Sequence, residues 1–283
     1  MDFKKQPVLH LHFICCFVLI TGGCVKAVFL HPTFQYILDR KIKAGAVSYL
    51  NTKPLLYGFQ QGAFDKELEL IETYPSRLAN MLIRDEIDLG LVPVAVIPIL
   101  KEHHIVSDYG ITCDGAVDSV CLFSNVPLEN IDTILLDYQS RTSVALLKIL
   151  LKEHWKIAPQ LAEGKEGYEN EIAGTTAGLV IGDRAFVQKE KNKYSYDLGT
   201  AWKQMTGLPF VFATWISNKV LPADFIERFN AANAVGLSQI DAVIAQNPGA
   251  GFDLKKYYTQ SISYTMDEEK RKALKLFLSK MEN

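Results

Sequence analysis

The chain has 283 residues, of which 48% are hydrophobic and 22% are charged, and its formal net charge is -2 at pH 7. It is long enough to bury a sizeable core, in one large domain or in two of ordinary size, and its charge argues against nucleic acid as the main partner. Five scattered cysteines and six histidines, three of them before residue 32, argue against a disulfide scaffold, a zinc site and a Ser-His-Asp triad, so we expect no metal.

The first 40 residues form a leader that differs from the rest of the chain. Lys4-Lys5 precedes an apolar run from Leu9 to Ile20, and TGGC follows at 21–24. This layout is typical of a secretory signal, although the run is short for a transmembrane helix and a lipoprotein signal acylated at Cys24 usually has Leu where Thr21 stands. The alternative is a start codon assigned too far upstream, which the abrupt start of a core strand at Lys41 favours. We expect a cytoplasmic protein without stable membrane association, unless the leader is a genuine export signal.

The body of the chain begins with a strand that leads into a helix. Residues 42–47 have the pattern of a short buried strand, the loop Ser48-Tyr49-Leu50-Asn51 follows, and Thr52-Lys53-Pro54 begins a helix with Thr52 or Asn51 as its cap. Such a connection presents free backbone N–H groups to one point, which favours a carboxylate or phosphate. It has no glycine cradle, which argues against a nucleotide. The alternative is an ordinary connection in which Asn51 only caps the helix.

The next hundred residues alternate strands and helices. The first helix is expected to end at Gly62, and a strand over 68–74, a helix over 75–84, a strand over 87–92 and a short helix to Leu100 follow. The apolar run 87–92 is typical of a parallel strand buried on both faces. The alternation predicts a doubly wound α/β lobe with ligands at the carboxyl ends of its strands.

Residues 113–124 contain a serine with two interpretations. Asp114-Gly115 forms a turn, and 117–123 is strand-like with Ser119 inside it. A lone serine in a strand usually bonds a neighbouring strand or faces water. A second α/β pattern follows directly, however, so this strand is a candidate crossover between two lobes, and Ser119 would then lie at a cleft.

A second candidate anion site follows a strand over 133–137. The loop Tyr138-Gln139-Ser140-Arg141-Thr142-Ser143 leads into a helix over 144–152, and its three hydroxyls lie beside the free N–H groups of that helix. Arg141 adds a bidentate carboxylate partner if it turns inward. The alternative is a redundant cap with Arg141 in solvent.

The remaining elements are a strand, a helix, a strand and a helical tail. Residues 178–182 form a strand, and Asp183 begins a helix that it caps in the simpler interpretation. A short helix from Leu198 ends at Gly207, and an aromatic-rich strand over 210–216 is a candidate for the return to the first lobe. The tail is predicted to be helical over 222–245, 251–258 and 266–281.

Several blocks of this sequence, in order, resemble the chorismate dehydratase family: VSYLNTKP (47–54), GLVP (90–93), CDGAVDSVCLFS (113–124), SRTS (140–143), IGD (181–183) and LGTAWKQMTGLPFVFATW (198–215). The resemblance covers the chain from Lys41 to the C-terminus, and the last block and SRTS are the most specific. It implies an α/β, two-lobed, type II periplasmic-binding-protein-like fold with two crossing strands. Lobe one would comprise about 41–121 and 214–283, and lobe two about 122–213.

The resemblance also implies a reaction. Members of this family are carbon–oxygen lyases that remove water from chorismate to give 3-[(1-carboxyvinyl)oxy]benzoate, in the futalosine route to menaquinone, and we expect no cofactor. By resemblance, Asn51 and Ser119 face the reacting centre as the catalytic residues. Neither is a base at neutral pH, so the enolpyruvyl carboxylate of the substrate is expected to take the proton. The two anion sites suit a dicarboxylate, with these substrate-binding residues: Ser48, Tyr49, Ser140, Arg141, Thr142, Ser143 and Asp183.

Two alternatives stay open. A solute-binding protein of the same fold would be favoured if the leader is a real export signal. The sister enzyme of the pathway, which makes 1,4-dihydroxy-6-naphthoate on the same fold, has a different, Pro/Cys-rich first loop in place of SYLNTKP.

Overall fold

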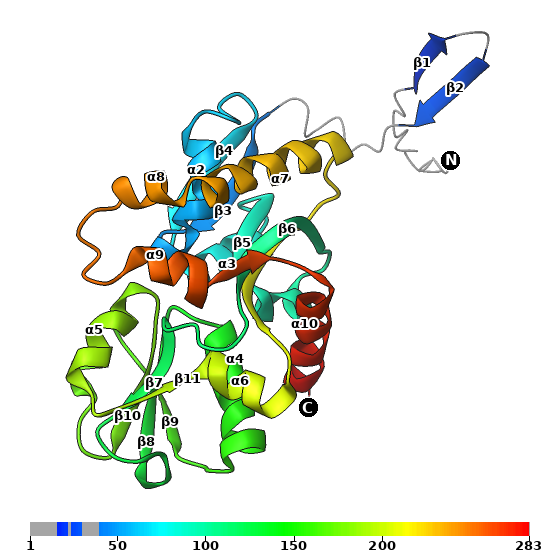
Figure 1. Cartoon of the computed structure of the whole chain (residues 1–283). Coiled ribbons are helices and arrows are strands. Elements are labelled where there is room, and N and C mark those ends of the chain that lie inside the picture. The colour runs from blue at the N-terminus through cyan, green and yellow to red at the C-terminus, as the bar shows by residue number, and fades with distance from the viewer. Residues whose placement is uncertain (1–15, 22–23, 30–39, 283) are drawn as a thin grey trace, which may run out of the picture. The chain divides into compact units, whose positions relative to one another are not determined.

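The computed structural model describes residues 16–21, 24–29 and 40–282, and the chain divides into two compact units, 1–41 and 42–283. In the first unit, β1 (Cys16–Thr21) and β2 (Cys24–Phe29) pair as an antiparallel hairpin (Figure 1). Lys4-Lys5 and the start of the predicted apolar run lie outside the described residues. Among the described residues, no helix is both long enough and apolar enough to span a membrane.

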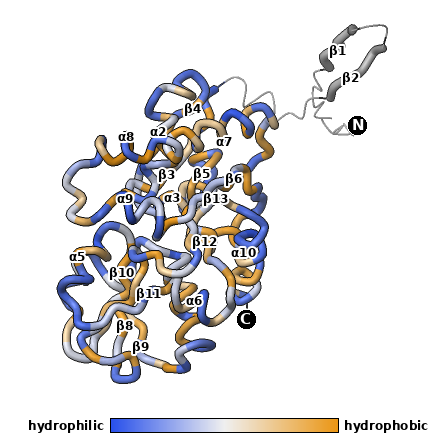
Figure 2. Tube along the Cα trace, in the orientation of Figure 1, coloured by the Kyte–Doolittle hydropathy of each residue, from blue (hydrophilic) through white to orange (hydrophobic). Residues whose placement is uncertain are grey.

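A six-stranded sheet in the second unit has the order β13-β6-β12-β5-β3-β4. Its parallel strands are β3 (Ile42–Val47), β4 (Leu68–Thr73) and β5 (Leu89–Pro93), and the last is buried along its whole length. β12 (Phe210–Ser217) runs antiparallel to both β5 and β6 (His104–Cys113), and β13 (Ser263–Thr265) lies at the edge. Figure 2 shows hydrophobic residues on β5 and β12, in the middle of the sheet.

Helices pack against this sheet and against one another. They are α2 (Lys53–Gln60), α3 (Pro75–Ile83), α7 (Ala223–Ser238), α8 (Ile240–Ala245), α9 (Leu254–Lys256) and α10 (Glu268–Met281). Two glycines let α2 approach α7: a Cβ at Gly58 would lie 2.2 Å from the Ala232 carbonyl oxygen, and one at Gly236 would lie 2.0 Å from that of Pro54. The backbones can therefore touch where larger residues would hold them apart.

A five-stranded sheet has the order β11-β7-β10-β8-β9. Its strands are β7 (Val120–Ser124), β8 (Thr133–Leu136), β9 (Gln160–Glu163), β10 (Thr176–Ile181) and β11 (Tyr194–Asp197). It carries α4 (Thr142–Ile149), which continues as the π-helix η4 (Leu150–Trp155), together with α5 (Asp183–Lys191) and α6 (Leu198–Thr206). Phe123, Tyr168 and Val180 belong to its core.

The chain passes between the sheets twice, from β6 to β7 and from α6 to β12. The first passage, residues 114–119, contains two residues with positive φ, Gly115 (116°) and Asp118 (62°). The predicted boundaries of the two lobes, 41–121 with 214–283 and 122–213, stay a prediction.

Several predicted elements need correction. Ser119 lies just before β7 and not within a strand, because Asp118 with its positive φ ends the preceding loop. The helix predicted over 144–152 begins two residues earlier, at Thr142. Thr52 occupies the N-cap position of α2, but its hydroxyl donates to Val47 and Tyr49 carbonyls and caps nothing. Six of the described strands were not predicted: β1 and β2 in the leader, and β6, β9, β11 and β13 in the second unit.

Candidate active site

A small cavity lies at the carboxyl ends of β3, β5, β8 and β10, where the sequence analysis expected ligands. It has a volume of about 50 Å³, and the residues that line it belong to both sheets and to the segments between them. The lining residues that the sequence analysis had singled out are Tyr49, Asn51, Ser119, Ser140, Thr142 and Ser143. Apolar side chains complete the wall: Val47, Pro75, Pro93, Ile111, Val117, Val120, Ile181, Phe212 and Ala213.

The loop before α2 fixes the backbone of Asn51. The Thr52 hydroxyl donates to the Val47 carbonyl at 2.6 Å and closes the loop on itself. The Tyr264 hydroxyl donates to the backbone carbonyl of Asn51 at 3.0 Å. The side-chain oxygen Oδ1 of Asn51 is buried without a hydrogen-bond partner, although buried polar atoms are normally paired.

Asp197 holds the loop that carries Ser119. Its carboxylate accepts the backbone N–H groups of Val117 at 3.0 Å and Asp118 at 2.8 Å, and it also caps α6. Burial raises the pKa of Asp197, against the opposing effect of these backbone hydrogen bonds. Ser119 is buried beside the cavity, and its hydroxyl has only a long contact of 3.4 Å with the Val117 carbonyl. That hydroxyl is therefore poised to turn towards a ligand.

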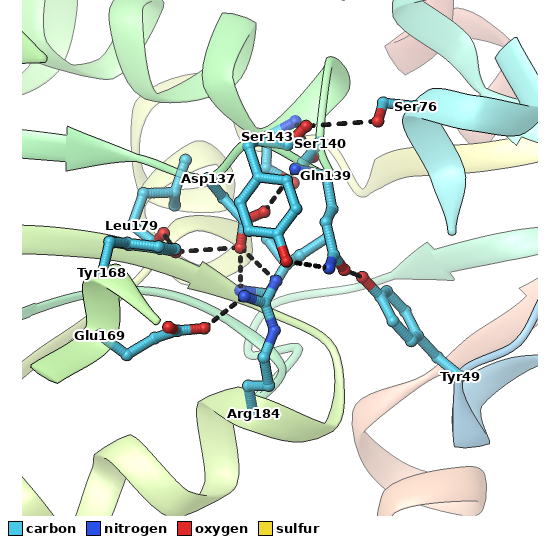
Figure 3. A network of polar contacts seen from close by, with 12 residues as sticks. Tyr49, Ser76, Asp137, Gln139, Ser140, Ser143, Tyr168, Glu169, Leu179 and Arg184 are labelled. Carbon is cyan, nitrogen blue, oxygen red and sulfur yellow. Dashed lines mark hydrogen bonds and ion pairs between the residues drawn. The ribbon is translucent and has the colours of Figure 1, made fainter. Parts of the chain in front are cut away.

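Asp137 organises the loop from Tyr138 to Ser143. Its buried carboxylate accepts the backbone N–H of Gln139 at 2.8 Å and bonds the Arg184 guanidinium at 2.7 Å (Figure 3). The Tyr168 hydroxyl donates to the same carboxylate at 3.0 Å. Burial raises the pKa of Asp137, and the Arg184 charge opposes that effect. The Asp137 carboxylate thus fixes the start of this loop to the second sheet and to Arg184.

The hydroxyls of the SRTS block have separate tasks. Ser140 Oγ accepts the Ser143 N–H at 3.1 Å, so Ser140 satisfies a free donor at the start of α4. Thr142 Oγ1 accepts the backbone N–H of Ala95, which belongs to the first sheet's segment η2 (Val94–Ile99), at 3.2 Å. With Ser143, these side chains line the cavity at the positive end of the helix dipole.

Tyr49 connects the first loop to the second sheet. Its hydroxyl donates to the side-chain oxygen of Gln139 (Figure 3). Its ring lies on Gly182, where an added Cβ would come within 2.8 Å of two ring carbons. Burial, followed by the Asp137 charge, raises the pKa of Tyr49 above that of an ordinary phenol. Tyr49 is therefore a neutral bridge across the cavity.

Three predicted substrate-binding residues do not line the cavity. Ser48 is exposed. The Arg141 guanidinium donates to Oδ1 of Asn80, on α3, at 2.8 Å. The Asp183 carboxylate accepts the backbone N–H of Leu50 at 3.2 and 3.3 Å, and the N-cap of α5 is Gly182, so the expectation that Asp183 caps this helix is wrong. Their roles in substrate binding stay predictions.

Tyr257 is a neighbour of Ser119 and Asn51 that the sequence did not predict. It lies in the π-helix η6 (Tyr257–Ser261), and its buried hydroxyl is next to Ser119 and Asn51. The only sequence signal was a pair of tyrosines, Tyr257-Tyr258, at the end of a segment expected to be helical. Among the described residues lining the cavity, none carries a carboxylate, an imidazole or an amine. Elsewhere in residues 16–21, 24–29 and 40–282, no group of three His, Cys, Asp or Glu side chains is arranged to hold a metal ion.

Comparison with known sequences gives a consistent result. A family model described as menaquinone biosynthesis matches residues 42–283. The chain is 29% identical over 258 residues to a protein of Thermus thermophilus named chorismate dehydratase, covering 82% of this chain and 92% of that protein. It is 27% identical over 248 residues to a protein of the same name in Campylobacter jejuni, covering 83% and 95%.

Comparison with solved structures shows the fold. A protein of Archaeoglobus fulgidus aligns with a TM-score of 0.69 at 16% identity, over 86% of this chain and 97% of that one. The periplasmic aliphatic sulphonate binding protein of Escherichia coli aligns with a TM-score of 0.57 at 14% identity, over 86% of each chain. The predicted periplasmic-binding-protein-like α/β fold is confirmed.

Proposed function

Because the chain belongs to the menaquinone biosynthesis family, we propose that it is a chorismate dehydratase, a carbon–oxygen lyase of the futalosine route. The observation that carries the proposal is the meeting of Asn51 and Ser119 at one cavity, opposite the hydroxyl-lined start of α4. These two residues are far apart in the sequence and come from different loops.

The reaction requires little beyond binding and charge stabilisation. The ring carbon that bears the enolpyruvyl ether loses its proton, the C–H electron pair enters the ring, and the neighbouring hydroxyl leaves with the C–O pair. The ring becomes aromatic, which supplies a strong driving force. The enzyme must hold the substrate in the reactive geometry and stabilise the departing hydroxide.

Asn51 and Ser119 are suited to the departing hydroxide. Both are neutral and can donate a hydrogen bond, and Ser119 has only its long contact with Val117 to give up. Since none of the described residues that line the cavity carries a carboxylate, imidazole or amine, the proton acceptor in this proposal is the enolpyruvyl carboxylate of chorismate. That carboxylate belongs to the ether substituent on the carbon that loses its proton. The proton and the hydroxide leave as water.

The start of α4 is suited to a carboxylate of the substrate. The side chains of Ser140, Thr142 and Ser143 line the cavity at the positive end of the α4 dipole, which favours an anion without a formal charge. The proposed location is the cytoplasm, which depends on the fate of residues 1–40 and not on the site.

The test is to incubate the purified full-length chain with chorismate and to follow the appearance of a benzoate-type ultraviolet spectrum. Ser119→Ala and Asn51→Ala should each lower kcat about a hundred- to a thousandfold while chorismate still binds, because each removes a donor to developing charge. Asn51→Asp should be at least as harmful, since it places a negative charge beside the hydroxide.

The control is Ser124→Ala, which removes a buried hydroxyl at the other end of β7, where it donates to the Val126 carbonyl at 2.8 Å. Its kcat should stay near that of the wild type. Chorismate binding without turnover would instead favour a solute-binding protein of the same fold. Wild-type turnover in Ser119→Ala would remove Ser119 from the mechanism.

A further inference from the structure

Two neighbouring polar atoms beside the cavity are buried without a hydrogen-bond partner: Oδ1 of Asn51 and the hydroxyl of Tyr257. Buried polar groups in proteins are nearly always paired, so an exception needs an explanation. The Asn51 and Ser119 side chains lie close enough to the Tyr257 hydroxyl to influence its ionisation, yet its oxygen completes no hydrogen bond. The pair of atoms therefore lies at the proposed reacting centre.

The ring of Tyr257 is held in a fixed orientation. The rings of Phe186, on α5, and Phe252 stack with their centroids 3.6 Å apart. The Tyr257 ring lies nearly edge-on to both, with centroid distances of 5.0 Å to Phe186 and 5.6 Å to Phe252. Only 2% of Tyr257 is exposed. Because its two side-chain torsions are fixed by this packing, its hydroxyl can reach only the groups beside it.

The hydroxyl is a donor and not a base. Burial raises the pKa of Tyr257 far above that of an ordinary phenol, and the nearby Ser119 and Asn51 side chains only partly oppose this. The proton therefore remains on the oxygen, where it needs an acceptor. Oδ1 of Asn51 is the neighbouring acceptor that lacks a donor.

We propose that Tyr257 is a positioning residue whose hydroxyl donates to Oδ1 of Asn51 in the substrate complex. This bond turns the amide NH₂ of Asn51 towards the cavity, where it donates to the departing hydroxide. Without it, the amide is free to rotate and present its oxygen, which repels that hydroxide. The inference rests on the proposed function.

The test is Tyr257→Phe, which keeps the ring and its packing against Phe186 and Phe252. The kcat should fall about tenfold, as for the loss of one positioning hydrogen bond, and KM should change little. The thermal unfolding midpoint should stay the same or rise, because the hydroxyl removed is unpartnered in the free protein. In an Asn51→Ala background, Tyr257→Phe should lower kcat no further, because its effect acts through that amide.

The matched control is Tyr258→Phe. The Tyr258 hydroxyl is also buried without a partner, but the Ser119 and Asn51 side chains, which influence the ionisation of Tyr257, do not influence that of Tyr258. Its kcat should stay within about twofold of the wild type. Wild-type kcat in Tyr257→Phe, an equal loss in both variants, or an undiminished effect in Asn51→Ala would each overturn the inference.

A lower unfolding midpoint at unchanged kcat, or loss of folded protein, would show that the Tyr257 hydroxyl is structural and would also overturn it. Absence of chorismate turnover in the wild type would overturn the proposed function together with this inference. Normal wild-type turnover with an unaffected Tyr257→Phe variant overturns the inference alone.

Discussion

Asp183 places a negative charge where the sequence predicts an anion. Both of its carboxylate oxygens face the backbone N–H of Leu50, at 3.2 and 3.3 Å, in the loop expected to bind a carboxylate. Burial raises the pKa of Asp183, and the Leu50 hydrogen bond and the charges of Lys53 and Arg184 oppose that effect. One donor of the first loop is thus occupied by the protein itself.

This pKa predicts a pH-dependent stability. The folded state binds the Asp183 proton more tightly than the unfolded state, so the associated stability is complete below the ordinary carboxyl pKa and is lost as the pH rises through the folded pKa. Asp183→Asn cannot titrate here. Its free energy of unfolding, relative to that of the wild type, should therefore increase from about pH 4 to about pH 7. Urea unfolding at matched pH measures this, and parallel curves would contradict it.

At the scale of elements, hydrogen bonds join α3 to the loop before α4, in addition to the Tyr49–Gln139 hydrogen bond between the two loops. The backbone N–H of Ser76 donates to the Gln139 carbonyl at 3.0 Å, and Ser76 Oγ donates to the Tyr138 carbonyl at 3.2 Å. Arg141 adds its bond to Asn80 at 2.8 Å. The loop that lines the cavity is therefore held by Asp137 on one side and by α3 on the other.

Arg141→Ala and Asn80→Ala should raise KM by similar factors, about tenfold at most, with a smaller effect on kcat. Each removes the same contact between α3 and the loop, and that contact favours the binding-competent arrangement. Steady-state kinetics with chorismate measures this. A rise confined to Arg141→Ala would instead support the direct carboxylate contact predicted from the sequence, and unchanged KM in both would make the contact incidental.

The elements that the sequence predicted correctly have local patterns. The spacing of hydrophobic residues predicts the parallel strands, such as β3 and β5, and Gly207 marks the end of α6. Strand β6 escaped prediction because its pairing with β12 shifts register between Val211 and Ala213 and between Thr214 and Ile216, which breaks a regular alternation. The contribution of Tyr257 could not be predicted, because the tail reaches the first loop only by folding: Tyr264 bonds Asn51 across 213 positions.

At the scale of the whole molecule, the cavity and its supports belong to one unit. The first loop, the passage 114–119, the SRTS block and the tail all lie within 42–283, which is also the range that the family model matches. The leader supplies none of the described residues that line the cavity.

A chain that starts at Lys41 should therefore fold and dehydrate chorismate with the kcat and KM of the full chain. The described helices and strands of the second unit all begin at or after Ile42. Circular dichroism and the ultraviolet assay on both proteins measure this. Loss of soluble, active protein on truncation would show that the leader is structural.

The small volume of the cavity has a consequence for the time course of catalysis. Sites that enclose a ligand of this kind usually measure roughly 300–1,000 Å³, whereas this one measures about 50 Å³. Under the proposed function, chorismate enters and the benzoate product leaves only if the walls separate, and the Tyr49–Gln139 contact across the cavity would break in that step. The rate of that opening is an upper limit on the turnover rate, even if the elimination step itself is faster.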